Sequence, residues 1–110
     1  MAKLEQILYD DFDELLIKIE TGIKNGSISA TLEDSSDFQS KSARCSVRVF
    51  ERYSSMGGNR VSLNVTLFQA DDGCVRLSAI TAGGSQALFF KINTLGEVAF
   101  LDKLKEVLAN

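Results

Sequence analysis

Hydrophobic and polar residues alternate along much of the middle of the chain, and this alternation predicts β-strands. Successive side chains of a strand point to opposite faces, so a half-buried strand has an apolar residue at every second position. The pattern predicts strands at residues 27–33, 44–54, 60–70 and 74–81. Asp72-Gly73 predicts a tight two-residue hairpin between the last two strands.

Two other segments have the periodicity of amphipathic helices. The first, residues 11–24, has apolar side chains three or four positions apart, and Asp11 with Glu14 predicts its N-terminal cap. Asn25-Gly26 is a typical end for such a helix. The second, residues 95–109, follows a capping box at residues 94–97.

Three segments have less regular patterns. Residues 3–9 are consistent with a short first strand, and residues 34–43 are so polar that they predict a loop. Residues 88–92 are too apolar for a free loop. They form either a short fifth strand or a segment packed under the last helix.

These elements predict a single α+β domain that spans residues 1–110. Each helix has one apolar stripe and the sheet has one fully apolar face, so the economical arrangement has two layers. It is a curved antiparallel sheet of four to five strands with both helices on one face, in the order (β)-α-β-β-β-β-α. This order of elements resembles the helix-grip and TATA-binding-protein-like folds.

The opposite face of the predicted sheet combines large apolar side chains with arginines. Strict alternation from Cys45, Val47 and Val49 as inward residues places these on the outer face: Arg48, Phe50, Arg52, Phe68, Arg76 and Ile80. Aromatic residues and arginine are enriched where proteins meet, and two such sheets packed face to face form a closed dimer. The sequence therefore predicts a homodimer through this face. The alternative is that these are ordinary scattered surface residues.

The same alternation directs Glu51 toward the helices. A carboxylate there must be paired, or it lies in a cavity where it can anchor a ligand. The second hypothesis is therefore a helix-grip type pocket for an unidentified small molecule, lined by Glu51, Tyr53, Phe90 and Phe100. The alternative for Glu51 is that a bulge or the end of the strand turns it away from the core.

Composition excludes several functional classes. The net charge of −3 and pI of 4.9 argue against a nucleic-acid partner. The absence of a signal sequence and of any long apolar run predicts a cytoplasmic protein with no membrane partner. There is no histidine, the commonest general base and metal ligand, so an enzyme is the least favoured hypothesis and no cofactor is predicted.

Smaller candidate sites have simpler explanations. The glycine pair in residues 83–86 can turn amide groups toward an anion, but it is more typical of a turn. The acidic residues of 33–37 lack the glycine and distal glutamate of a calcium loop, and no metal site is predicted. Cys45 is expected to face the core and Cys74 the outer side, so no disulfide is expected between them.

Four stretches of the chain resemble one family. They are LEDSSD at 32–37, VFERYS at 49–54, SAITAGGSQ at 78–86 and FFKINT at 89–94. They are similar to a family of small, uncharacterised proteins of Gram-positive Firmicute bacteria, known only as a domain of unknown function. The resemblance implies a bacterial cytoplasmic protein. It carries no activity, cofactor or catalytic residue to this chain.

Overall fold

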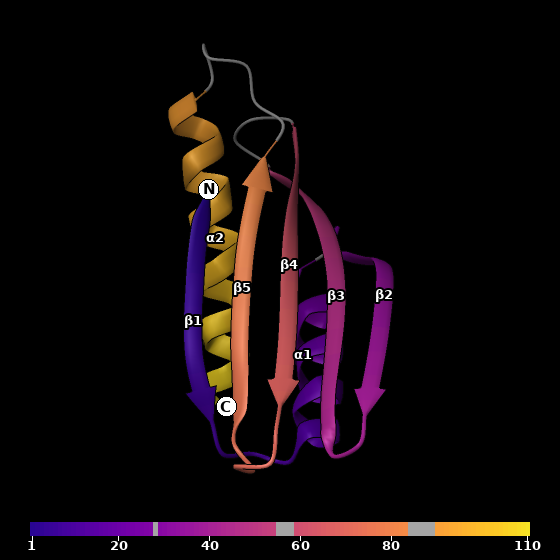
Figure 1. Cartoon of the computed structure of the whole chain (residues 1–110). Coiled ribbons are helices and arrows are strands. Elements are labelled where there is room, and N and C mark those ends of the chain that lie inside the picture. Colours follow the sequence, from indigo (N-terminus) through magenta and orange to yellow (C-terminus); the bar gives the residue numbers. More distant parts are fainter. Residues whose placement is uncertain (28, 55–58, 84–89) are drawn as a thin grey trace.

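The computed structural model describes residues 1–27, 29–54, 59–83 and 90–110 as one sheet covered by two helices (Figure 1). The elements are β1 (Ala2–Leu8), α1 (Phe12–Gly26), β2 (Thr31–Ser40), β3 (Ala43–Ser54), β4 (Asn59–Gln69), β5 (Val75–Gly83) and α2 (Phe90–Ala109). All strand pairs are antiparallel, in the spatial order β1-β5-β4-β3-β2. The predicted α+β class, antiparallel sheet and order of elements are confirmed.

The cap predicted for the first helix is confirmed. The Asp11 carboxylate accepts a hydrogen bond of 3.0 Å from the backbone N–H of Glu14, which satisfies one of the free donors at the helix start. Helix α1 then buries one stripe against the sheet, composed of Phe12, Leu15, Ile19 and Ile23. The periodicity of the sequence therefore identified both the helix and its buried side.

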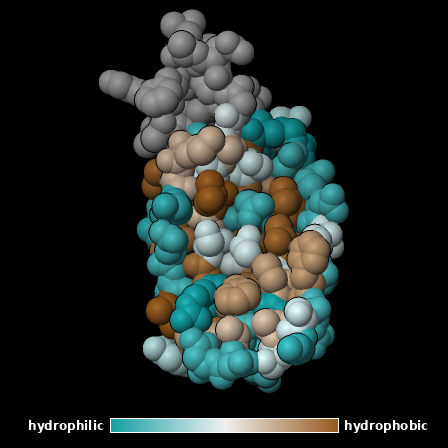
Figure 2. Space-filling model, in the orientation of Figure 1, coloured by the Kyte–Doolittle hydropathy of each residue, from teal (hydrophilic) through white to brown (hydrophobic). Residues whose placement is uncertain are grey.

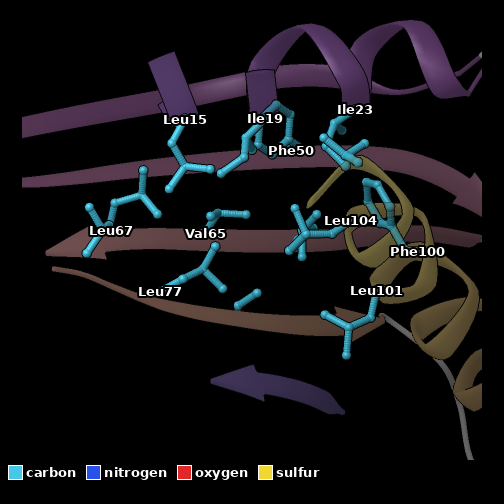
Figure 3. Packing of buried hydrophobic residues seen from close by; sticks show 14 of the residues in the cluster. Leu15, Ile19, Ile23, Phe50, Val65, Leu67, Leu77, Phe100, Leu101 and Leu104 are labelled. Carbon is cyan, nitrogen blue, oxygen red and sulfur yellow. The ribbon is translucent and has the colours of Figure 1, made fainter. Parts of the chain in front are cut away.

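The core lies between the helices and one face of the sheet (Figure 3). Helix α2 contributes Phe100, Leu101, Leu104 and Val107, opposite the stripe of α1. The central strands β4 and β5 contribute alternate residues, Val61, Leu63, Val65, Leu67, Val75, Leu77 and Ala79. We call this side of the sheet the inner face and the opposite side the outer face.

Strand β3 is turned over relative to its predicted orientation. Phe50 lies opposite Leu63 of β4 and is 0% exposed, so it belongs to the core and not to the outer face. Arg48 and Arg52 have the same parity and lie on the inner face with it. Alternation favours the more apolar set, which contains Cys45, Val47 and Val49, whereas the inward set is polar apart from Phe50. Burial of the large Phe50 ring decides the orientation.

Three predicted boundaries are also wrong. Residues 31–40 form the edge strand β2, so much of the predicted polar loop is a strand with solvent on both sides. Helix α2 begins at Phe90, which makes residues 90–92 helical; residues 88 and 89 lie outside the described part. Glu97 of the predicted capping box lies inside α2, where its carboxylate pairs with the α-ammonium group of Met1.

The tight hairpin is at a different place from the predicted one. Ser40 pairs with Ala43, so β2 and β3 are joined by Lys41-Ser42 alone, and Lys41 adopts φ of 54°. The connection that contains Asp72-Gly73 has five residues, 70–74, with Gly73 at φ of 80°. Gly73 still serves the turn, because glycine adopts positive φ without steric cost.

Gly22 lets the two helices approach each other. A Cβ atom built on Gly22 would lie 2.6 Å from both Cγ atoms of Val107 on α2, which is closer than real contacts allow. A Cβ on Gly26, one turn later, would meet the flexible stem of Lys103 instead, at 2.9 Å. The glycine at position 22 is therefore required by packing, whereas Gly26 has a neighbour that can move.

We expect Gly22→Ala to lower the free energy of unfolding by up to about 2 kcal/mol. The overpacking against Val107 costs about 1–3 kcal/mol, which outweighs about 1 kcal/mol of gained helix propensity. Urea denaturation of Gly22→Ala and of the matched control Gly26→Ala measures the difference, and the control should be neutral or slightly stabilising. In a Val107→Ala background Gly22→Ala should become stabilising. Equal destabilisation in both backgrounds would disprove the role assigned to this contact.

Candidate functional site

The outer face of the sheet is the side that the helices leave uncovered (Figure 2). Cross-strand pairing arranges its residues in rows that run from the β1 edge to the β2 edge. Three such rows are Lys3-Ile80-Asn64-Val49-Asp34, Glu5-Ser78-Thr66-Val47-Ser36 and Ile7-Arg76-Phe68-Cys45-Phe38. We call these three rows the outer patch.

The outer patch combines apolar and polar side chains, and charged residues lie at both ends of its first row. Phe68 is 39% and Ile80 is 40% exposed, and Ile7 and Phe38 are exposed as well, whereas Val47 and Val49 beside them are partly buried. Figure 2 shows this apolar surface interrupted by polar residues. The outer patch is therefore a mixed surface of exposed apolar and polar side chains.

Charged residues lie along the two edges of the outer patch. On β1, Lys3 and Glu5 lie 3.5 Å apart, and Asp34 lies at the other end of the same row as Lys3. Arg76 Nη2 donates to Asp72 at 2.8 Å, and this hydrogen bond lowers the pKa of Asp72 and raises that of Arg76. The row that begins at Lys3 therefore has a cation at its β1 end and an anion, Asp34, at its β2 end.

Phe68 stands between two open depressions of the outer face. The larger, about 590 Å³, lies toward β1 and is lined by Glu5, Gln6, Ile7, Thr66, Phe68, Arg76, Leu77 and Ser78. The smaller, about 300 Å³, lies toward β2 and is lined by Phe38, Gln39, Ser40, Ala43, Arg44, Cys45 and Phe68. An apolar side chain of a facing surface could occupy either depression beside the Phe68 ring.

The structure places three of the six predicted interface residues on the outer face. Phe68, Arg76 and Ile80 lie there as expected, whereas Arg48, Phe50 and Arg52 lie on the inner face. Sequence reasoning missed other members of the patch, namely Ile7, Phe38, Val47 and Val49. Ile7 could have been found by extending the alternation through residues 3–9, but the two valines were assigned to the core.

The predicted ligand pocket is not assembled. Glu51 and Tyr53 point to the outer face, whereas Phe100 is fully buried on the other side; the side chain of Phe90 lies outside the described part. Glu51 Oε1 accepts a hydrogen bond of 2.7 Å from Arg60 Nε. The bulge considered for β3 is instead in β2, between Leu32 and Asp34.

A polar network replaces apolar packing on the inner face beside β2. The Arg48 side chain is 9% exposed and its Nε donates to Glu20 of α1 at 2.8 Å, while Nη1 donates to Asp37 of β2 at 3.0 Å. Burial alone would lower the pKa of Arg48, but the hydrogen bonds to Glu20 and Asp37 raise it. Ser46 Oγ donates to Asp37 at 2.6 Å. The network ties the edge strand to α1 and satisfies the buried charge.

The smaller candidate sites gain no support. Among the described residues no group of His, Cys, Asp or Glu side chains is arranged to hold a metal, and residues 33–37 lie along β2. Cys45 lies on the outer face, not in the core, and both cysteines are free and partly buried. Residues 84–86 of the glycine turn lie outside the described part. Neither helix, over its described residues, is long and apolar enough to cross a membrane.

Comparison with known proteins identifies the family of this chain. The model of a family of unknown function, DUF6054, matches residues 1–110, so the chain belongs to that family. No curated protein and no solved structure matches it. The resemblance to a domain of unknown function is thereby confirmed, while the Firmicute origin stays a prediction.

We expect the Asp37 network to make stability depend on acid pH. The hydrogen bonds from Ser46 and then Arg48 hold the pKa of Asp37 below its ordinary value of 3.8. A carboxylate with a lowered folded-state pKa contributes stability above its unfolded pKa and loses it as the pH falls through the folded pKa. Stability should therefore decline below about pH 4.

Urea denaturation between pH 5 and pH 2 measures this dependence. Asp37→Asn should be less stable at pH 5 and lose less stability on acidification than the unmodified protein. Ser46→Ala removes the principal donor but keeps the carboxylate, so its slope should be intermediate. An unchanged slope in Asp37→Asn would show that Asp37 is not coupled to folding.

Proposed function

We propose that this protein is an interaction module that forms a homodimer through the outer patch. The observation that supports the proposal is the register of the sheet, which places Phe68 on the central strand of the patch and Lys3 and Asp34 at opposite ends of one row. A two-fold symmetric interface must be complementary to itself, so each charged edge has to meet an edge of opposite sign.

The charges of the outer patch satisfy this requirement for one direction of the two-fold axis. With the axis parallel to the strands, the β1 edge of one copy faces the β2 edge of the other. Lys3 then lies near Asp34 of the second copy, and Asp34 near its Lys3. The axis passes over β4, so the Phe68 rings of the two copies face each other and the adjacent depressions receive them. Sheets packed face to face in this way keep their strands aligned to within about 30°.

The size of the face is also adequate. Strands lie about 4.8 Å apart and rise about 3.3 Å per residue. The five strands and the 11 residues of β4 therefore span roughly 24 by 36 Å, or about 860 Å². Stable interfaces bury about 800 Å² on each partner. Most of the outer face must therefore take part, which the distribution of apolar residues from Ile7 to Phe38 permits.

We expect sedimentation equilibrium to show a dimer at micromolar concentration, and Phe68→Arg to give a monomer. The substitution places two cations against each other on the axis and removes the central apolar contact. Ile17→Arg is the matched control, because Ile17 is 65% exposed on α1, away from the sheet face. Unchanged circular dichroism would show that both variants are folded. A monomeric unmodified protein, or a dimeric Phe68→Arg variant, would contradict the proposal.

Charge-reversal variants test whether the two-fold axis of the dimer runs parallel to the strands. Lys3→Glu and Asp34→Lys should each weaken dimerisation several-fold, since an exposed ion pair contributes about 0.2–1 kcal/mol and occurs twice in the dimer. The double variant restores opposite charges across the interface and should recover most of the affinity. Additive losses in the double variant would exclude this axis.

A further inference from the structure

Arg52 differs from every other arginine of the chain in having no carboxylate partner. Arg44, Arg48, Arg60 and Arg76 each form an ion pair of 2.7–2.8 Å with an aspartate or glutamate. No acidic group among the described residues pairs with Arg52. The stretches whose side chains are not described, residue 28, residues 54–59 and residues 84–95, contain neither Asp nor Glu. The chain therefore has no carboxylate for this guanidinium.

The Arg52 guanidinium lies in surroundings that hydrate it less well than bulk water does. The side chain lies on the inner face, partly buried, with its guanidinium carbon 4.6 Å from the centre of the Phe100 ring. Burial lowers the pKa of Arg52, although an arginine stays charged at neutral pH. The aromatic ring attracts the cation but accepts few of its five N–H donors. A partly buried cation without a carboxylate partner is suited to binding an anion.

The neighbouring positions leave the guanidinium in an apolar setting. Arg52 pairs in register with Val61 of β4, and Val61 pairs with Gly83 of β5, which has no side chain. Phe50 and Leu63 form the next row of the inner face. None of these side chains carries an acceptor for the guanidinium, so these neighbours leave its N–H donors to solvent or to a bound group.

We propose that Arg52 binds the oxyanion group of a small molecule, a carboxylate or a phosphate. The planar guanidinium offers two parallel N–H donors, which match the two oxygen atoms of either group. The Phe100 ring lies 4.6 Å from the guanidinium carbon and cannot itself provide the two oxygen acceptors. The site lies on the opposite side of the sheet from the outer patch, so it does not depend on the proposed dimer.

The test compares melting temperatures in chloride, phosphate and benzoate buffers of equal ionic strength. A ligand that binds only the folded state raises the melting temperature, and at several times its dissociation constant the rise is about 4–8 °C for a domain of this size. We expect such a rise with phosphate or benzoate, and the two arms distinguish a phosphate ligand from a carboxylate ligand. Arg52→Gln should lose it. Arg60→Gln, which removes a paired and exposed arginine, should retain it.

The same strand supplies a control for folding. In chloride, Arg52→Gln should be at least as stable as the unmodified protein, because it removes an unpaired and partly buried charge. Arg48→Gln should be less stable, because it leaves Glu20 and Asp37 without their cation. Phosphate also stabilises proteins by exclusion from their surface, so the decisive quantity is the difference between variants. No rise in either anion, or the same rise in Arg52→Gln, would overturn the proposal.

Discussion

The pairing of β3 with β4, which places Phe50 opposite Leu63 in the core, is the constraint from which the other features follow. Side chains of a strand alternate with a period of two, so one inward residue determines the direction of all the others. With Phe50 inward, Arg48 and Arg52 are carried to the helix side, while Cys45, Val47 and Val49 are carried to the outside. The apolar outer patch and the buried arginines are consequences of the same register.

The two inward arginines illustrate two outcomes for a buried charge. Arg48 lies where β2 and α1 both supply a carboxylate, so its charge is compensated and the network secures the edge strand. Arg52, two residues further along, has the Phe100 ring but no acidic partner. An external anion would supply the charge that the described part of the chain does not provide there.

Periodicity predicted the elements of this fold better than their faces. The stripe from Phe12 to Ile23 could bury only one side of α1, and Asp11 marked its start, so both were predicted correctly. In β3 the alternation favoured Cys45, Val47 and Val49 as the inward set, and contacts with other parts of the chain reversed this by burying Phe50. In β2 the residues from Asp34 to Ser40 are polar apart from Phe38, because both faces of this edge strand meet solvent, so their pattern resembles that of a loop.

The amino-acid sequence by itself determined the α+β class, the order of elements, the helix stripes and the presence of apolar and cationic residues on the central strands. These properties follow from local spacing, which acts within a few residues of chain. Only the tertiary structure decided that Val47 and Val49 join Phe68 on the outside, that Glu51 and Phe100 lie on opposite faces, and that Arg48 is paired while Arg52 is not. Each of these depends on which residues meet across strands, and the burial of Phe50 against distant parts of the chain settles that pairing.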